Sequence, residues 1–427
     1  MKSRKVLTYM TAMVLFSVLA APSSLAGQTN YGVVELAELG GTAGAANSIN
    51  DRGWATGGDN LPGDATSMAT LWIRGSLKAP LGTLGGPNSI VAWPVKNNNG
   101  VIVGISETAD IDPVGEFFSC WPFFAAGTPT GRVCKGFRWQ NGQMTALPPF
   151  PGGYSSYATG VNNAGQVVGW AENGVHDATC NTSFQTLQFR AAIWQPDGTM
   201  QELPPLPGDS TSAATAINDV GQVVGISGDC GIAVGGVSAR HAVLWQNDIP
   251  IDLGNIGGDA WNTPTAITNG GTIIGFANTQ PGAARTFQAF VWTPSNGMQS
   301  LGTLPGDFRS EALGLNEKGQ IVGLSRGNPP NAPFLIRAFL WENGKMTDMN
   351  SLTGGSPYLL FANDIDQEGH IVGEALDLNT GDAPGFLATP GPPGAAISAA
   401  APAVTQQRSL PDHVRRQIER QALASDK

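Results

Sequence analysis

The sequence predicts an all-β fold: a seven-bladed β-propeller with four-stranded blades, closed by an N-terminal strand that completes the C-terminal blade. Three observations support this prediction. A turn motif with two glycines four positions apart recurs seven times, with a period of about 50 residues. A short strand ending in Trp follows six of these copies. A strand near the N-terminus has no hairpin of its own, and the last copy is one strand short.

Each copy begins with a β-hairpin, as in "GLNEKGQIVGLS" at 314–325. An Asn or Asp opens a tight turn by bonding its own backbone, and a Gly three positions later accepts a positive φ without a Cβ clash. Thr268 replaces this Asn or Asp in the fifth copy, and Lys96 in the second copy stands where the others have Ile, Val or Leu. The seven glycine pairs are Gly53/Gly57, Gly100/Gly104, Gly165/Gly169, Gly221/Gly225, Gly271/Gly275, Gly319/Gly323 and Gly369/Gly373.

A third and a fourth strand follow the hairpins. The third is a four-residue run of β-favouring residues such as "AVLW" at 242–245, and the fourth is a run such as "MQSL" at 298–301. The seventh copy has "GFLA" at 385–388, which lacks the Trp, and no fourth strand follows it. Because one unit cannot bury its apolar face alone, we expect the recurring Trp to pack between neighbouring units; the alternative is a ligand platform.

The missing fourth strand is expected at the other end of the chain. The segment "VELAELGG" at 34–41 matches "IDLGNIGG" at 251–258, which follows the third strand of the fourth copy. We therefore expect the N-terminal strand to pair with the seventh blade. Closure of the ring removes the open edges on which other strands can pair. The alternative is an open solenoid, which leaves the N-terminal strand without a partner.

The repeat resembles the HAF family of probable extracellular repeats, which is named for a His-Ala-Phe run. That run appears here as "RHAVLW" at 240–245 and "RAFLW" at 337–341, and the resemblance covers roughly residues 31–390. The resemblance implies an exported protein built from repeats. It implies no activity and supplies no catalytic residues.

Three regions follow from these patterns. Residues 1–26 have a basic start, an apolar run and a small-residue exit, which is typical of a cleaved secretory signal. The alternative is a membrane anchor, which needs roughly 20 uninterrupted apolar residues. Residues 27–390 form the propeller, and residues 391–427 form a flexible linker and a short C-terminal helix. We expect a secreted or periplasmic monomer with no membrane span after signal cleavage.

The charge of the chain excludes some partners. Without Lys2, Arg4 and Lys5 the mature chain carries 20 Lys and Arg against 33 Asp and Glu, a net charge of about −13. Such a surface repels phosphate backbones, so nucleic acid is not an expected partner. Only 13% of the residues are charged, whereas 57 are Gly, a composition with many turns.

We expect binding on the face formed by the links from fourth to first strands and from second to third strands, because these links differ between copies. The longest insertions are at 105–135 and 171–190. The first insertion is rich in aromatic residues, which favours a contact surface; the alternative is a satellite core that folds the loop onto its blade. The candidate binding residues are Phe117, Phe118, Trp121, Phe123, Phe124, Asp209, Asp259, Trp261 and Asp307.

The predicted function is a non-enzymatic binding module for an unidentified protein or glycan, without a cofactor. The alternative is a polysaccharide-acting enzyme, a glycoside hydrolase or lyase, with carboxylates contributed by different blades. Asp209, Asp259 and Asp307 are the candidates for that chemistry, since paired carboxylates act as acid and base on glycosidic bonds. The sequence contains no nucleophile elbow, metal motif or phosphate loop.

Four cysteines in an exported chain favour disulfides. Cys120 and Cys134 lie in one insertion, and Cys180 and Cys230 lie in corresponding loops of neighbouring blades. We therefore predict the pairs 120–134 and 180–230, one of three connectivities. A zinc site is disfavoured because neither Cys-x-x-Cys nor clustered His is present.

Overall fold

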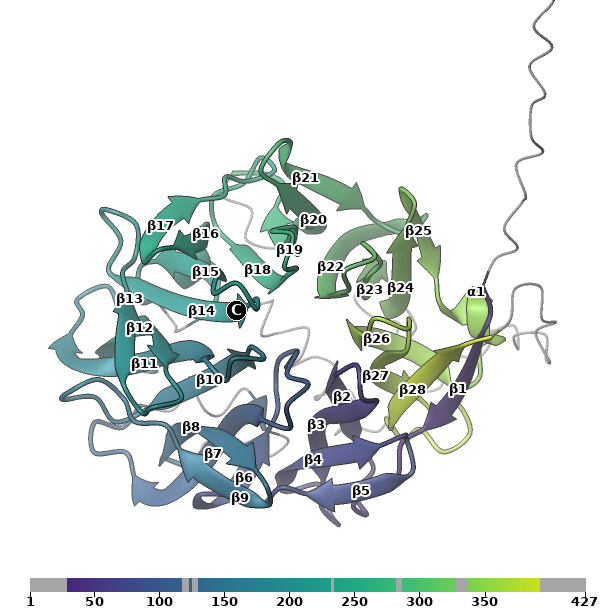
Figure 1. Cartoon of the computed structure of the whole chain (residues 1–427), viewed down its shortest axis with the longest axis horizontal. Helices are drawn as coiled ribbons and strands as arrows, with labels where there is room; N and C mark the ends of the chain where they lie inside the picture. The colour runs from purple at the N-terminus through teal and green to yellow at the C-terminus, as the bar shows by residue number, and fades with distance from the viewer. Residues whose placement is uncertain are drawn as a thin grey trace, which may run out of the picture.

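The computed structural model describes residues 29–116, 123–124, 130–231, 234–281, 286–327 and 336–391. These residues form seven four-stranded antiparallel sheets arranged in a ring (Figure 1). The prediction of a seven-bladed β-propeller is confirmed. The predicted signal segment, 1–26, lies outside the described residues, as does the predicted tail after Gly391. No helix in the described ranges has the length and apolar character needed to cross a membrane.

The blades follow one another along the chain, each from its inner to its outer strand. Blades 1 to 3 contain β2 (Gly44–Ile49), β3 (Trp54–Asn60), β4 (Ser67–Ile73), β5 (Leu77–Pro80); β6 (Gly85–Ile90), β7 (Ile102–Ile111), β8 (Arg132–Gln140), β9 (Gln143–Ala146); β10 (Ser156–Val161), β11 (Val167–His176), β12 (Leu187–Trp194) and β13 (Met200–Leu203). Blades 4 and 5 contain β14 (Thr211–Ile217), β15 (Val223–Gly228), β16 (His241–Gln246), β17 (Ile249–Asp252); β18 (Asn262–Ile267), β19 (Ile273–Asn278), β20 (Phe287–Thr293) and β21 (Gly297–Gly302).

Blades 6 and 7 contain β22 (Asp307–Leu315), β23 (Ile321–Gly327), β24 (Ile336–Glu342), β25 (Lys345–Asp348); β26 (Tyr358–Ile365), β27 (Ile371–Leu376), β28 (Gly385–Pro390) and β1 (Tyr31–Glu35). Among the described residues, the 3₁₀ helix η2 (Gly236–Ala239) lies in a link of blade 4, and α1 (Asn350–Thr353) lies in the link before blade 7.

The N-terminal strand β1 lies on the outer edge of blade 7, where the two ends of the ring meet (Figure 1). It pairs antiparallel with β28, from Tyr31 opposite Pro390 to Glu35 opposite Phe386. The strand begins three residues earlier than the matched segment 34–41, because that segment contains the end of the strand and the link that follows it. Blade 7 thereby obtains its fourth strand from the other end of the chain.

Two different constraints explain the glycine pairs. The first glycine lies in the turn, where Gly165 has a φ of +83°. The second lies on strand 2, directly against the inner strand: a Cβ on Gly169 would lie 1.8 Å from the Tyr157 carbonyl oxygen. Equivalent close approaches occur at Gly57, Gly225 and Gly323. The first glycine is therefore required by the turn conformation, and the second is required by the close contact between the two backbones.

The six recurring Trp residues all pack in hydrophobic clusters, as expected, but Trp139, Trp292 and Trp341 are only partly buried. Trp72, Trp194 and Trp245 are buried. Their indole N–H groups donate to the carbonyls of Ala37, Pro148 and Pro204, at 2.8, 2.9 and 2.7 Å. Each acceptor lies in the link that leads into the same blade, so the indole fastens that link to the third strand.

The second blade is irregular because the segment that leads from its inner strand to the turn Asn is two residues longer than in blade 3. Ser89 and Ser156 hold equivalent places, since each accepts a backbone N–H from the third strand of the preceding blade. From Ser89 the chain needs two more residues to reach its turn Asn than it needs from Ser156. Strand β6 ends at Ile90, so the extra residues lie outside the strand, before the turn that contains Asn97.

Candidate functional site

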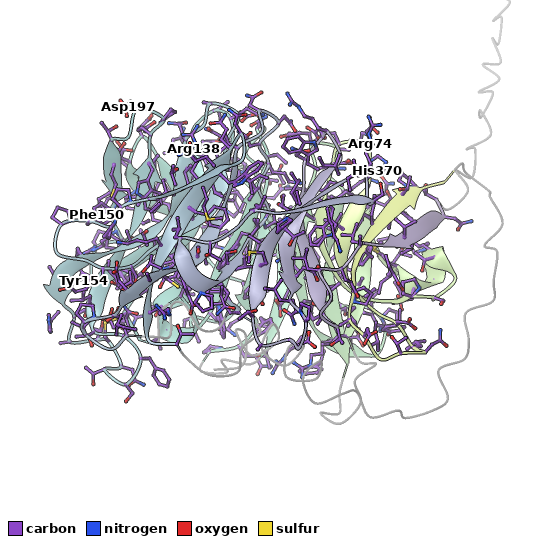
Figure 2. All side chains as sticks on the ribbon, turned by 90° about the horizontal axis from the view of Figure 1, so that it is seen from below. Arg74, Arg138, Phe150, Tyr154, Asp197 and His370 are labelled. Atoms are coloured by element: carbon purple, nitrogen blue, oxygen red, sulfur yellow. A yellow bond between two sulfur atoms is a disulfide. The ribbon has the colours of Figure 1, made fainter. Side chains whose placement is uncertain are left out.

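The ring has two faces. The turn face carries the hairpin turns between strands 1 and 2 and between strands 3 and 4, and the loop face carries the other links. In the side view of Figure 2, Arg74, Asp197 and His370 lie along the upper side, which is the turn face, and Tyr154, in a link to an inner strand, lies lower. The binding residues predicted from the sequence belong to the loop face.

Two of the predicted loop-face carboxylates are held in ion pairs. The Asp307 carboxylate lies 2.8 Å from the Arg337 guanidinium, which also lies 3.1 Å from Asp348. Asp209 accepts a hydrogen bond of 2.7 Å from the Ser227 hydroxyl and lies 3.9 Å from His241. Both Asp side chains are only 5% exposed.

These ion pairs explain the first residue of the His-Ala-Phe pattern. His241 is the first residue of β16 in blade 4, and Arg337 is the second residue of β24 in blade 6. Each bridges an acid near the start of its inner strand to an acid on its outer strand, Asp252 or Asp348. The hydrogen bond with Asp252 and the charge of Asp209 raise the pKa of His241. Each cation therefore fastens strands of one blade, so Asp209 and Asp307 have structural partners.

The predicted aromatic contact residues lie partly outside the described ranges, among them Phe117, Phe118 and Trp121. Phe123 is half-buried with its ring 5.0 Å from Trp93, and Phe124 is only 3% exposed. Trp261, 4% exposed, packs against Phe276 and Phe287. The burial of Phe124 and the packing of Phe123 against Trp93 fit the satellite core that was the alternative for the blade 2 insertion. Trp261 lies outside that insertion, and its buried ring offers no contact surface. Asp259 is exposed.

The predicted disulfide between Cys180 and Cys230 is confirmed. It joins loops of blades 3 and 4, and the Asn181 N–H donates to the Gly231 carbonyl at 2.7 Å beside it. Cys134 is buried on β8, and its predicted partner Cys120 lies outside the described residues. Disulfides persist in oxidising compartments, which agrees with export.

Replacing Cys180 and Cys230 together by Ala is expected to lower the free energy of unfolding by about 2–4 kcal/mol, because the bond closes a long loop in the unfolded chain. Chemical unfolding without reductant measures the change. An unchanged unfolding midpoint would contradict a stabilising role for this bond.

A buried pair of carboxyl groups, Glu116 and Glu172, lies between blades 2 and 3, and no sequence pattern pointed to it. Glu116 accepts backbone N–H groups of Thr186, at 2.5 Å, and Leu187. Glu172 accepts the Ser155 N–H at 2.8 Å. Burial first, and then the neighbouring Glu172 carboxylate, raise the pKa of Glu116 well above its usual range. Both side chains are almost fully buried, so we interpret the pair as an anchor for the blade 2 insertion.

This pair predicts a pH dependence of stability. The folded state keeps Glu116 protonated at pH values where the unfolded chain, with a pKa of 4.5, has released the proton. The free energy of unfolding should therefore fall as the pH rises above that value, and Glu116→Gln should weaken this fall. Urea unfolding at several pH values tests the effect, with Glu368→Gln, whose side chain is 76% exposed, as the charge-matched control. Parallel pH profiles for wild type and Glu116→Gln would refute it.

A cavity of about 190 Å³ opens at the channel mouth on the turn face, the face opposite to the one predicted. All seven blades contribute to its lining. Ile217, Ile267 and Leu315 supply apolar surface, and turn residues supply a polar rim. A cavity with apolar walls and a few converging polar groups is the usual form of a small-ligand site.

The rim consists of one residue from each blade, the residue that follows the turn Asn or, in blades 5 and 7, Thr268 or Asp366. Its backbone N–H donates to the side-chain oxygen of the equivalent residue in the next blade, at 2.7–3.1 Å, and the bonds close a full circle. The rim residues are Asp51, Asn98, Asn163, Asp219, Asn269, Glu317 and Gln367. Three carboxylates therefore surround the mouth.

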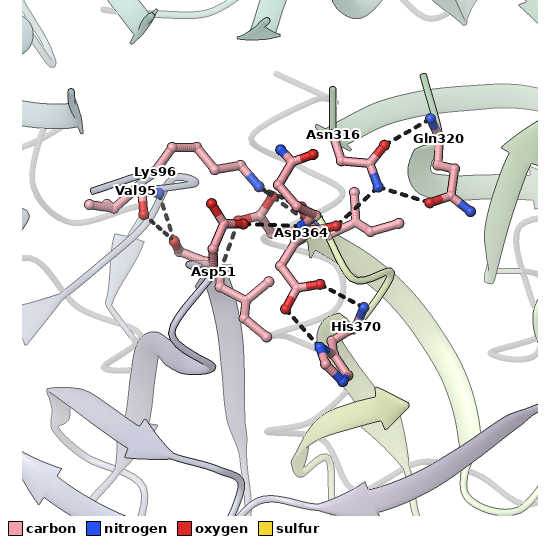
Figure 3. A network of polar contacts seen from close by, with 12 residues as sticks. Asp51, Val95, Lys96, Asn316, Gln320, Asp364 and His370 are labelled. Carbon is pink, nitrogen blue, oxygen red and sulfur yellow. Dashed lines mark hydrogen bonds and ion pairs between the residues drawn. The ribbon is translucent and has the colours of Figure 1, made fainter. Parts of the chain in front are cut away.

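The turn Asn residues form a second, incomplete ring below the rim. Their side-chain amides donate to the carbonyl of the equivalent residue in the next blade, for example Asn162 to Asn218 at 3.1 Å. The series is interrupted at Thr268 and at Asp366, which carry no amide. Asp366 instead bonds the His370 ring at 2.8 Å, where other blades pair Asn with Gln (Figure 3).

Lys96 of blade 2 reaches past blade 1 to blade 7, beside the second interruption. Its ammonium group lies 2.5 Å from the Asp364 carboxylate and donates to the Ile365 carbonyl at 2.6 Å (Figure 3). Asp364 is fully buried and also accepts the Ile49 N–H at 2.8 Å. The contacts join blades 2, 1 and 7 at the point where the ring closes. The departures of Lys96 and Thr268 from the repeat were the sequence signals for this site.

No protein-family model matches the chain, and no curated protein matches it. Solved structures give low similarities. The β-propeller domain of the trilobed protease from Pyrococcus furiosus is 7% identical, with 83% of this chain and 100% of that chain covered and a TM-score of 0.44. A puromycin hydrolase is 11% identical, with 83% and 52% covered and a TM-score of 0.42. A putative gluconolactonase is 13% identical, with 46% and 69% covered and a TM-score of 0.26.

Proposed function

We propose that this protein is an exported, non-enzymatic binding module whose ligand occupies the cavity on the turn face. The observation that supports this proposal best is the cavity itself, which all seven blades line. The rim hydrogen bonds hold its polar groups in place before a ligand arrives, which lowers the entropic cost of binding. The Cys180–Cys230 disulfide and the signal-like N-terminus support export.

The turn face is preferred to the loop face because several predicted loop-face residues are paired with cations or buried. On the loop face, Asp209 and Asp307 pair with cations of their own blades, and Phe124 and Trp261 are buried. On the turn face, the exposed Glu317 borders the cavity. The proposed site therefore moves to the opposite end of the channel.

Binding is preferred to catalysis because two of the three rim carboxylates have fixed roles as acceptors. Asp51 accepts the Gln367 N–H at 3.1 Å and the Asn98 amide at 2.8 Å, and Asp219 accepts two groups of Asn163. Protonation of either carboxylate would remove an acceptor from the circle. General acid and base catalysis needs groups that exchange protons during turnover.

A glycan array combined with a hydrolysis screen of the secreted protein tests the proposal. We expect retention of a ligand without cleavage products, and loss of that ligand in Ile267→Trp, which fills the cavity from its apolar wall. An unchanged thermal transition in the variant shows that the ring is intact. Cleavage products from any polysaccharide, or full binding by Ile267→Trp, would refute the proposed function.

A further inference from the structure

We infer that the cavity accepts a small organic cation, a primary amine with a short apolar chain, whose ammonium group binds between blades 5 and 6. The subsite is the Glu317 carboxylate at the rim, next to Thr268 of the cavity lining. This inference rests on the proposed binding function and specifies its ligand class.

The interruption at Thr268 marks the place of the subsite. In blade 4, Asn218 donates its side-chain amide to the Thr268 carbonyl at 2.9 Å, and in blade 6, Asn316 donates to the Asp366 carbonyl at 3.0 Å. Thr268 carries no amide, so the amide ring is interrupted between blades 5 and 6. Thr268 and Glu317 both line the cavity at this interruption.

Glu317 supplies the charge at the same place. One of its carboxylate oxygens accepts the Asn269 N–H at 2.7 Å, and its side chain is exposed at the rim. A carboxylate has about four acceptor sites, so this bond leaves capacity for an ammonium group. Hydrogen bonds between charged partners are shorter and stronger than neutral ones.

The wall beside the subsite is apolar. Ala266 and Ile267 of blade 5 and Leu315 of blade 6 line the cavity next to Thr268 and Glu317. A short alkyl chain attached to the ammonium group would cover these side chains and displace water from them. Burial of that apolar surface adds to the attraction between the charges.

The balance of charge in the cavity favours a cation. Lys96 also lines the cavity, but its ammonium group is paired with Asp364 at 2.5 Å. The remaining charged groups of the lining are the carboxylates of Asp51, Asp219 and Glu317. The chain as a whole carries a formal net charge of −10, which also attracts cations.

Three probes of equal length separate charge from apolar contact: n-pentylamine, 1-pentanol and pentanoate. Calorimetric titration of the full-length protein is expected to show binding of n-pentylamine, at least tenfold weaker binding of 1-pentanol, and none of pentanoate. Equal affinity for amine and alcohol, or preference for pentanoate, would overturn the inference.

One variant locates the amine, and it places a residue that blade 7 already uses at the same position. Glu317→Gln keeps an acceptor for the rim, as Gln367 does in blade 7, and should weaken n-pentylamine binding roughly tenfold. Glu368→Gln, with the same charge change on the same face outside the cavity lining, should bind as wild type. Wild-type affinity in Glu317→Gln would overturn the subsite.

The two proposals fail differently. If a neutral or anionic ligand binds and Ile267→Trp abolishes that binding, the cavity functions and the choice of a cation is wrong. If n-pentylamine binds equally to wild type and Ile267→Trp, the amine binds elsewhere and the inference is wrong. If wild type binds none of the three probes, the cation inference is wrong, whereas the glycan screen still decides the proposed function.

Discussion

Removal of residues 28–40 is expected to destabilise the propeller far more than removal of residues 391–427. The deletion removes β1 and leaves the β28 edge unpaired, from Phe386 to Pro390. It also removes the buried side chains of Tyr31 and Leu36. Burial of two such side chains and the lost hydrogen bonds together amount to on the order of 5 kcal/mol or more, comparable with the whole stability of many domains.

Further losses follow at the junction of blades 7 and 1. The Leu36 N–H donates to the Gly385 carbonyl at 2.8 Å, and the Trp72 indole donates to the Ala37 carbonyl at 2.8 Å. The deletion therefore removes the acceptor of the Trp72 indole, which lies on the third strand of blade 1. It also removes the donor to the Gly385 carbonyl of blade 7. An exposed β28 edge also favours pairing between molecules.

Thermal unfolding and light scattering of the two truncated proteins measure this difference. The expected result is a lower midpoint and a concentration-dependent aggregate for the truncation at 28–40, and a midpoint near that of the full chain for the truncation at 391–427. Equal midpoints would show that β1 contributes no stability to the ring.

The repeat made the fold predictable from the sequence. Each turn needs an Asn or Asp and a Gly with positive φ, and each second strand needs a Gly where a Cβ would meet the inner strand, as at Gly169. These are local requirements, so they leave a local pattern that recurs with the blade period. The absence of a fourth strand after 385–388 then indicated where β1 belongs.

The candidate site was less predictable because it depends on contacts between distant residues. Lys96 was visible as a departure from the repeat, but its partner Asp364 is 268 positions away. The acids of the loop face looked available because the sequence does not show that Arg337 lies within 2.8 Å of Asp307. The rim position is Asp, Asn, Glu or Gln in different blades. Each of these side chains offers an oxygen that accepts the rim hydrogen bond, so the bond recurs although the residue type does not.

Breaking the pair of Lys96 and Asp364 is the second large effect that we expect. Lys96→Met leaves the Asp364 carboxylate fully buried without its counter-charge, which should cost about 3–5 kcal/mol of unfolding free energy. Asp364→Asn should cost less, because the Lys96 side chain is 34% exposed and keeps access to water, and because Asn retains an acceptor for the Ile49 N–H.

The double variant Lys96→Met/Asp364→Asn separates the pair from its components. With no charge left to bury, the double variant should be more stable than Lys96→Met alone, so the two changes are strongly non-additive. Urea unfolding of the four proteins gives the coupling free energy. Additive losses would show that the two side chains act independently and that their 2.5 Å contact does not hold the ring closed.

The pH dependence of Lys96→Met gives an independent check on the same carboxylate. Burial raises the pKa of Asp364 even with Lys96 present, and removal of the ammonium group removes the largest opposing influence. The folded variant should therefore take up a proton at pH values where the unfolded chain, with a pKa of 3.8, remains ionised. Its deficit relative to wild type should shrink as the pH falls toward that value, because a neutral Asp364 needs no counter-charge. A deficit that stays constant with pH would mean that Lys96 stabilises the ring through packing of its alkyl chain and not through its charge.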